Sequence, residues 1–135
     1  MSLSRSEECV AAASRPRGRV GVDVERLMPL PGAFSRYFLH PSEEEALRGW
    51  DDPLTASLAA WTIKEAVLKA LGVGLTVPPK AVIIGDMTPA GCVAVVVQGT
   101  SVRASCWKED GTVVAVASVG TPSIPAISVS RTETR

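Results

Sequence analysis

The sequence is poor in the residues that mark several protein classes. Three of its 135 residues are cysteine and one, His40, is histidine. Cys9, Cys92 and Cys106 are odd in number and lack the spacing of a zinc site. They favour reduced, mostly buried thiols in a cytoplasmic protein. His40 lies in a loop before a predicted helix cap, so we expect it to be structural rather than a ligand.

Charge of one sign and long apolar runs are also missing. Lysine and arginine together number 14, as do aspartate and glutamate, so no nucleic-acid surface is indicated. No apolar run reaches the roughly 18 residues that span a membrane, and no signal peptide is predicted. The length predicts one domain at 1–120. The Ser-, Thr- and Pro-rich remainder, 121–135, predicts a flexible C-terminal tail.

The stretch 61–75, WTIKEAVLKALGVGL, predicts the end of a long helix that begins near residue 54 or 55. Most of its residues form helices readily, and a glycine follows where a helix commonly ends. Trp61, Glu65 and Lys69 succeed one another at four-residue steps, on a different side from the apolar residues. Taken alone, Glu65 and Lys69 fit a surface ion pair worth roughly 0.2–0.5 kcal/mol.

A second stretch, RVGVDVERL at 19–27, alternates valine with small or acidic residues. This is the pattern of a strand with one buried face. Asp23 and Glu25 then project from the same face, about 7 Å apart. Adjacent carboxylates repel unless a cation lies between them, and oxygen ligands of this kind favour Mg²⁺ or Mn²⁺. The alternative is a solvated strand face, although acidic residues are poor strand formers.

The two stretches together resemble the 4′-phosphopantetheinyl transferase superfamily. The family signatures, G-[IV]-D-[IV]-E on a strand and W-x-x-K-E-[AS]-x-x-K on a helix, read GVDVE at 21–25 and WTIKEAVLK at 61–69. Their order and separation also match. Because the strand carries D-x-E, the chain looks closest to the surfactin-synthetase-activating type. The resemblance covers about residues 3–119 and only the second half of those two-lobed enzymes.

The resemblance implies transfer of the 4′-phosphopantetheine arm of coenzyme A to a serine of an acyl or peptidyl carrier protein, with release of 3′,5′-ADP. It implies a Mg²⁺ ion, or Mn²⁺, held by Asp23, Glu25 and Glu65. Either Glu65 or a metal-bound water would accept the serine proton. Lys69 is the expected cation for charge on the leaving phosphate. Trp61 is expected to pack beneath the site.

Two further residues are implied as contacts to coenzyme A. Leu3-Ser4-Arg5-Ser6 resembles the family motif [IL]-S-H-S, in which the histidine contacts a phosphate. Arg5 stands in the histidine position and can also bind phosphate; the alternative is a polar end of the chain. Lys64 is the second candidate, although the helix pattern points it away from Lys69.

We predict an α+β fold of the transferase type, an antiparallel sheet packed on one long helix with a shorter helix nearby. A basic turn at 15–19 is expected to join a strand at 9–13 to GVDVE as a hairpin. Ser42 is expected to cap a helix that ends near residue 49. Further strands are predicted at 81–84, 93–98, 102–107 and 112–119.

The missing first lobe bears on assembly and activity. Compact enzymes of this superfamily form active sites between subunits, so the chain is expected to be a homo-oligomer, for example a trimer. It could instead be a domain of a larger synthase. Two other functions remain open: a catalytically degenerate homologue that binds a carrier protein or synthase, and a metal-dependent enzyme acting on another phosphorylated substrate.

Overall fold

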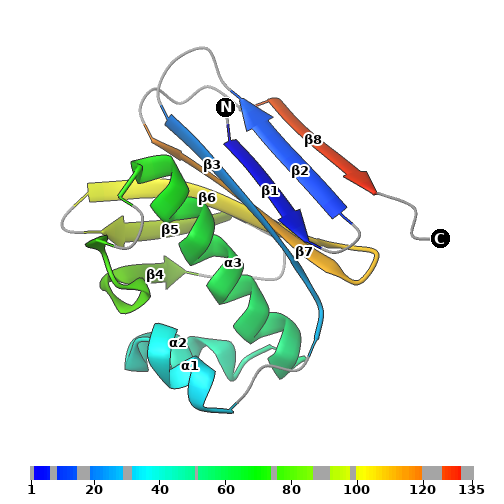
Figure 1. Ribbon diagram of the computed structural model, residues 1–135. Coiled ribbons are helices and arrows are strands. Elements are labelled where there is room, and N and C mark those ends of the chain that lie inside the picture. The colour runs from blue at the N-terminus through cyan, green and yellow to red at the C-terminus, as the bar shows by residue number, and fades with distance from the viewer. Residues whose placement is uncertain are drawn as a thin grey trace.

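A five-stranded antiparallel sheet and one long helix form the centre of the computed structural model (Figure 1). The structure describes residues 2–6, 9–14, 19–28, 32–50, 52–73, 76–86, 92–97, 100–119 and 126–131. In spatial order the strands are β3 (Arg19–Arg26), β7 (Thr112–Val119), β6 (Thr100–Glu109), β5 (Cys92–Val97) and β4 (Val82–Asp86). Helix α3 (Pro53–Leu71) packs mainly on β3 and β7. The predicted α+β class is therefore confirmed.

A second antiparallel sheet consists of β1 (Ser2–Ser6), β2 (Cys9–Ser14) and β8 (Ala126–Arg131), in the order β1-β2-β8. The predicted hairpin between β2 and β3 is wrong, because β2 pairs with β1 and β8 while β3 pairs with β7. Within the stretch expected to be a tail, residues 126–131 form β8, whose backbone hydrogen bonds are used in pairing with β2.

Both ends of α3 follow local signals in the sequence. The Asp52 side chain accepts a hydrogen bond from Leu54 N at 3.1 Å and caps the first turn. Gly72 ends the helix in the left-handed region, with φ of 67°, where glycine has no steric penalty. Arg19 of β3 donates to the carbonyl of Leu71 at 2.7 Å, which satisfies one of the last acceptors of the helix.

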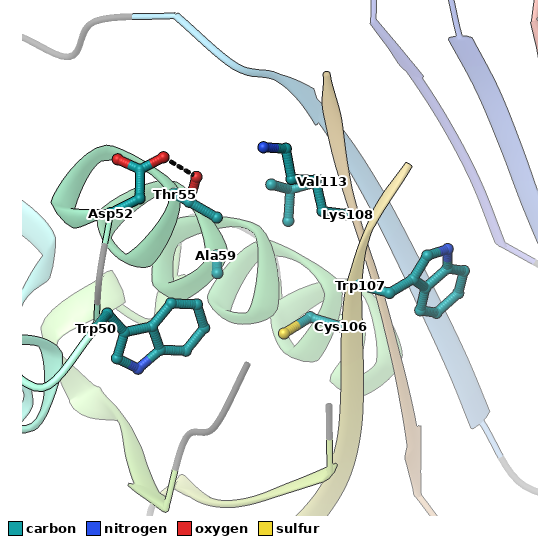
Figure 2. Close-up of a pocket in the computed structure, with 8 residues that line it drawn as sticks. All are labelled: Trp50, Asp52, Thr55, Ala59, Cys106, Trp107, Lys108 and Val113. Carbon is teal, nitrogen blue, oxygen red and sulfur yellow. Dashed lines mark hydrogen bonds between the residues drawn. The ribbon is translucent and has the colours of Figure 1, made fainter. Parts of the chain in front are cut away.

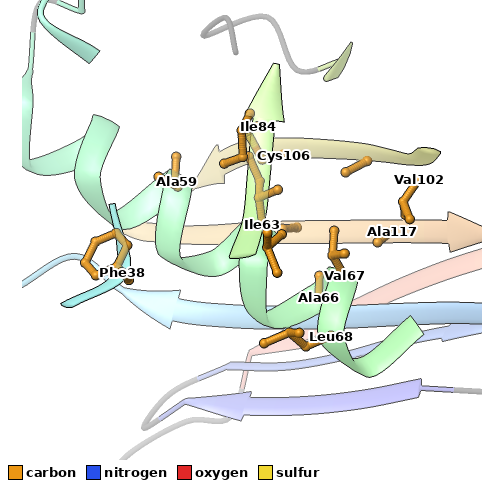
Figure 3. Close-up of a cluster of buried hydrophobic side chains, with 14 of the residues drawn as sticks. Phe38, Ala59, Ile63, Ala66, Val67, Leu68, Ile84, Val102, Cys106 and Ala117 are labelled. Atoms are coloured by element: carbon orange, nitrogen blue, oxygen red, sulfur yellow. The ribbon is translucent and has the colours of Figure 1, made fainter. Parts of the chain in front are cut away.

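The apolar side of α3 forms the main core with the sheet. Ile63, Ala66, Val67 and Ala70 are at most 1% exposed, as the predicted apolar arc requires. Figure 3 shows Ile63 and Val67 among side chains from the neighbouring strands. Valines of β3 and β7 that point away from α3 form a second cluster with Trp107. None of the described helices is both long and apolar enough to cross a membrane.

Two short helices, α1 (Gly32–Phe38) and α2 (Pro41–Leu47), precede α3, and a single 3₁₀ turn, η2 (Pro79–Ala81), follows it. The predicted Ser42 cap is wrong. Pro41 occupies the first helical position, where no N–H is needed, and this moves the cap to His40. His40 Nδ1 accepts from Ser42 N, and Glu43 accepts from His40 N. His40 is thus structural, as predicted.

Candidate active site

Near the start of β3, the backbone of the strand comes unusually close to α3. A Cβ atom on Gly21 would lie 1.9 Å from the carbonyl oxygen of Ala66. The glycine of GVDVE is therefore a steric requirement, because only a residue without a side chain lets the strand backbone touch the helix. A glycine inside a valine-rich strand was the sequence signal for this approach. The contact holds the two signature stretches together.

Asp23 and Glu25 follow Gly21 on the same face and meet Glu65 of α3. Asp23 is buried, while Glu25 and Glu65 are half-buried. Burial, followed by the charge of Asp23 and a hydrogen bond with it, raises the pKa of Glu25 to about 7, and Glu65 adds to the shift. Burial and the charge of Asp23 also raise the pKa of Glu65. Asp23 and its two neighbours thus lie close enough together to disfavour the ionisation of Glu25 and Glu65.

This donor set fits a hard divalent cation by its chemistry. Crowded carboxylate oxygens in a partly buried place are stabilised by a cation, and oxygen ligands are those that Mg²⁺ and Mn²⁺ prefer. In the described ranges, however, no three acidic, histidine or cysteine side chains are arranged as a ligand shell. The carboxyl groups interact electrostatically. The assignment of Asp23, Glu25 and Glu65 as metal ligands stays a prediction.

Lys69 lies at the edge of the carboxylate cluster. Its ammonium donates to Val22 O at 3.0 Å and to Asp23 Oδ1 at 3.2 Å. Its positive charge partly offsets the rise in the pKa of Glu65, which lies one helical turn earlier. The side chain is 35% exposed, so the ammonium borders the solvent rather than the core. The cation predicted from the helix spacing is therefore adjacent to the acidic residues of both stretches.

Trp61 supports the cluster from below. Its ring packs edge-on against Phe34 and Phe38, with centroids 5.0 and 5.3 Å away. A side-chain hydrogen bond with Trp61 favours the ionised form of Glu25. Trp61 thus packs beneath the site, as its place in the sequence predicted. Its influence on the pKa of Glu25 was not predicted from the sequence.

The two expected contacts to coenzyme A have different surroundings. Lys64 is completely buried, and its ammonium donates to Glu43 Oε1, Pro79 O and Val82 O at 2.7, 3.0 and 2.7 Å. All three of its N–H donors are therefore used inside the protein. The contact between Lys64 and a phosphate of coenzyme A stays a prediction. Sequence reasoning did not identify Glu43, because no local pattern links these two residues. Arg5 lies in β1 opposite Val10, and its side chain is outside the described part.

A cavity of about 260 Å³ lies elsewhere, beside the first half of α3 and lined in part by Trp50, Thr55 and Cys106 (Figure 2). Thr55 is ten residues before Glu65, which corresponds to about 15 Å along a helix. Figure 2 shows Trp107 on the opposite side of β6 from Cys106. Burial raises the pKa of the Cys106 thiol to about 11, so the thiol is a poor nucleophile at neutral pH. The cavity contains none of the predicted site residues.

The sequence profile of the 4′-phosphopantetheinyl transferase superfamily matches residues 19–117, which include both signature stretches. The chain belongs to this superfamily. The 4′-phosphopantetheinyl transferase gsp of Aneurinibacillus migulanus is 30% identical over 79 residues, covering 57% of this chain and 33% of the relative. The chain therefore spans about one third of that longer transferase.

Solved structures of the superfamily share the fold. The holo-[acyl-carrier-protein] synthase of Thermotoga maritima superposes with a TM-score of 0.62 at 24% identity, over 74% of this chain and 61% of the other. The holo-[acyl-carrier-protein] synthase of Neisseria meningitidis gives the same score and identity, over 76% and 98%. At this identity the two structures support the architecture alone. The residues of the site must be argued from this chain.

Proposed function

We propose that this chain transfers the 4′-phosphopantetheine arm of coenzyme A to a serine of an acyl or peptidyl carrier protein and releases 3′,5′-ADP. The observation that carries the proposal is the meeting of Asp23, Glu25, Glu65 and Lys69 at the contact of β3 and α3. The chain belongs to the transferase superfamily, and phosphopantetheine transfer is the reaction that this cluster of residues would best serve.

Asp23, Glu25 and Glu65 would hold Mg²⁺, with Mn²⁺ as an alternative. The ion, when bound, neutralises the pyrophosphate of coenzyme A and so lowers the barrier to attack. The raised pKa values of Glu25 and Glu65 support this assignment, because a cation relieves the repulsion that raises them. This chain supplies the cluster by packing a strand directly on a helix.

Proton transfer and charge stabilisation are assigned to two residues of α3. The pKa of Glu65 is raised toward the working pH, as a base that accepts the serine proton requires. Lys69 is partly exposed and carries a positive charge beside the cluster, so it can stabilise charge on the phosphate that leaves. Arg5 is retained as a second phosphate contact because guanidinium binds phosphate bidentately.

A neighbouring subunit is proposed to complete the coenzyme A pocket. The chain covers only one third of the longer transferase. A homo-oligomer, such as a trimer, would provide the missing wall. The same contact could come from another domain if this sequence is part of a larger synthase.

A second function is also consistent with the one-third coverage of the longer transferase. A homologue that binds a carrier protein or synthase without transferring the arm would also retain the fold, and it would not need a complete coenzyme A pocket. The presence of Asp23, Glu25, Glu65 and Lys69 together favours the transferase, because a binding module has no need of a costly acidic cluster.

Intact-protein mass spectrometry separates these functions. The chain is incubated with an apo carrier protein, coenzyme A and Mg²⁺, and the carrier is expected to gain the mass of the phosphopantetheine arm. Glu65→Gln, which preserves size but removes the carboxylate, is expected to abolish the gain. A wild-type chain that binds the carrier without modifying it would support the binding module instead. A wild-type chain that modifies neither an acyl carrier protein nor a peptidyl carrier protein would contradict the proposed transfer.

A further inference from the structure

A buried ion pair joins three separate parts of the chain behind the candidate active site. Lys64 of α3 is 0% exposed and Glu43 of α2 is 3% exposed, with 2.7 Å between Nζ and Oε1. The second carboxylate oxygen of Glu43 accepts from Ile84 N of β4 at 2.8 Å. The ammonium also binds the carbonyls of Pro79 and Val82. The pair therefore links α2 and α3 to η2 and the edge strand β4.

The contacts of Lys64 and Glu65 lie on two different sides of α3. Lys64 and Glu65 are neighbours in the sequence and so lie about 100° apart around the helix. With Lys64 held toward α2 and β4, Glu65 is directed toward Asp23 and Glu25 of β3. Lys69, which follows Glu65 by one turn, is then directed toward Asp23. A rotated helix would move both functional side chains away from the cluster.

The pair is an expensive way to hold a helix if stability is its only purpose. Burial lowers the pKa of Lys64, and contact with Glu43 acts in the opposite direction. Two charges in an apolar interior lose hydration, and well-packed neutral replacements are often as stable or more stable. Apolar side chains, however, can slide past one another, whereas five directional hydrogen bonds fix a single arrangement.

We propose that Lys64 and Glu43 are positioning residues, which set the rotation of α3 and thereby bring Glu65 and Lys69 to the carboxylates of β3. The proposal rests on the proposed function, because phosphopantetheine transfer is the purpose that the alignment of Glu65 and Lys69 would serve. It also places Lys64 outside any direct contact with coenzyme A. The alignment itself can be measured in the protein without substrate.

The test uses a neutral pair of matched shape, Glu43→Gln combined with Lys64→Met. Its control is Glu45→Gln combined with Lys80→Met, which makes the same chemical changes at two exposed residues of α2 and η2. Melting temperatures are compared first. The buried double variant is expected to fold and to melt at or above the temperature of the wild type, because the desolvation of two charges is removed.

The indole N–H of Trp61 reports the alignment in an amide correlation spectrum. Trp61 lies one turn before Glu65 on α3 and its ring packs against Phe34 and Phe38 of α1, so a changed rotation of α3 shifts or broadens its signal. Trp107 provides an internal control, because its indole binds Glu109 at 3.2 Å on another part of the sheet. We expect the Trp61 signal to change in the buried double variant and the Trp107 signal to stay.

Direct titration with Mn²⁺, without substrate, gives the second readout. Loss of residues that orient metal ligands commonly weakens metal binding by 10–100-fold, and we expect a fall of at least about tenfold in the buried double variant alone. A Trp61 signal and a Mn²⁺ affinity equal to those of the control would overturn the proposal. Failure of the wild type to modify a carrier would contradict the proposed function but leave the Trp61 result decisive for the positioning role.

Glu43→Gln alone covers the case in which the double variant does not fold. The amide oxygen still accepts hydrogen bonds from the groups around it, so the network is weakened rather than removed. A shifted Trp61 signal in this folded variant would support the proposal. If both variants fail to fold, the pair is a stabilising element only and the proposal is wrong.

Discussion

The ammonium of Lys69 lies 3.2 Å from Oδ1 of Asp23 and joins α3 to β3 at the centre of the candidate site. The Lys69 side chain is 35% exposed and that of Asp23 is 7% exposed. Asp23 is buried, but water screens the ammonium of Lys69, so the pair contributes less to stability than a fully buried ion pair does. The position of Lys69 beside three carboxyl groups is therefore better explained by chemistry than by stability.

Lys69→Ala tests that explanation. A cation directed at developing phosphate charge contributes on the order of 3 kcal/mol to the barrier, so the rate of phosphopantetheine transfer is expected to fall about a hundredfold. The free energy of unfolding should change by about 1 kcal/mol or less. Lys80→Ala, at an exposed site of η2, is the control. Turnover close to the wild-type value would make Lys69 a structural partner of Asp23.

Asp23→Asn tests the metal assignment. The amide keeps the size of the side chain and one acceptor for Lys69, but removes the charge that attracts a divalent ion. The Mn²⁺ affinity measured by calorimetry is expected to fall more than about tenfold, since the charge of ligands governs the binding of hard cations. Asp110→Asn changes the same residue type in an exposed turn and should leave the affinity unchanged. Equal affinities in the two variants would contradict the assignment.

The stability of the metal-free protein should depend on pH through Glu25. Its pKa is raised from 4.5 to about 7, chiefly by burial. Between these values the folded protein binds more protons than the unfolded chain, so stability falls as pH rises from 4.5 to 7. Denaturant unfolding with a chelator present should show this fall, and Glu25→Gln should reduce it. An identical pH dependence in wild type and variant would show that Glu25 is not responsible.

Assembly can be tested by relating activity to mass in solution. If a neighbouring subunit completes the coenzyme A pocket, specific activity should decrease when dilution dissociates the oligomer. Light scattering at each dilution gives the mass that corresponds to each rate. A monomer that retains full activity at assay concentration would remove the argument drawn from the chain's one-third coverage of the longer transferase.

Local patterns were sufficient for the elements that carry the site. The alternation around Asp23 and Glu25 predicted β3, and the spacing of Trp61, Glu65 and Lys69 predicted the side of α3 that differs from its apolar arc. Both patterns depend on neighbours within one turn or one strand, which are readable in a sequence. The side of β3 and the side of α3 that carry the candidate site were thus predictable without knowing that the two elements are in contact.

Pairings between distant segments were not predictable from the sequence. Strand β8 pairs with β2 across more than a hundred residues, and it lies within a Ser-, Thr- and Pro-rich stretch that favoured a loose tail. Lys64 was predicted as a contact to coenzyme A, and no local pattern indicated its burial, because charged residues are seldom fully buried. Its partner Glu43 is 21 residues away on another helix. Such partners depend on the tertiary arrangement rather than on local spacing.

Gly21→Ala tests whether the first residue of GVDVE has a steric role. The added Cβ would lie 1.9 Å from Ala66 O and 2.5 Å from Ala70 N, both backbone atoms that cannot move without the helix. Overpacking commonly costs about 1–3 kcal/mol and occasionally more, and a clash with two backbone atoms should reach at least the upper end of this range. Chemical unfolding should therefore show a large loss of stability.

Gly49→Ala provides the matched control for Gly21→Ala. A Cβ there would lie 3.7 Å from Ala46 O, an ordinary contact, so stability should be nearly unchanged. Because Gly21 holds β3 against α3, metal affinity and turnover should fall together with stability in Gly21→Ala but not in Gly49→Ala. A Gly21→Ala protein that is as stable as the wild type would show that the close contact of β3 and α3 is not needed to form the site.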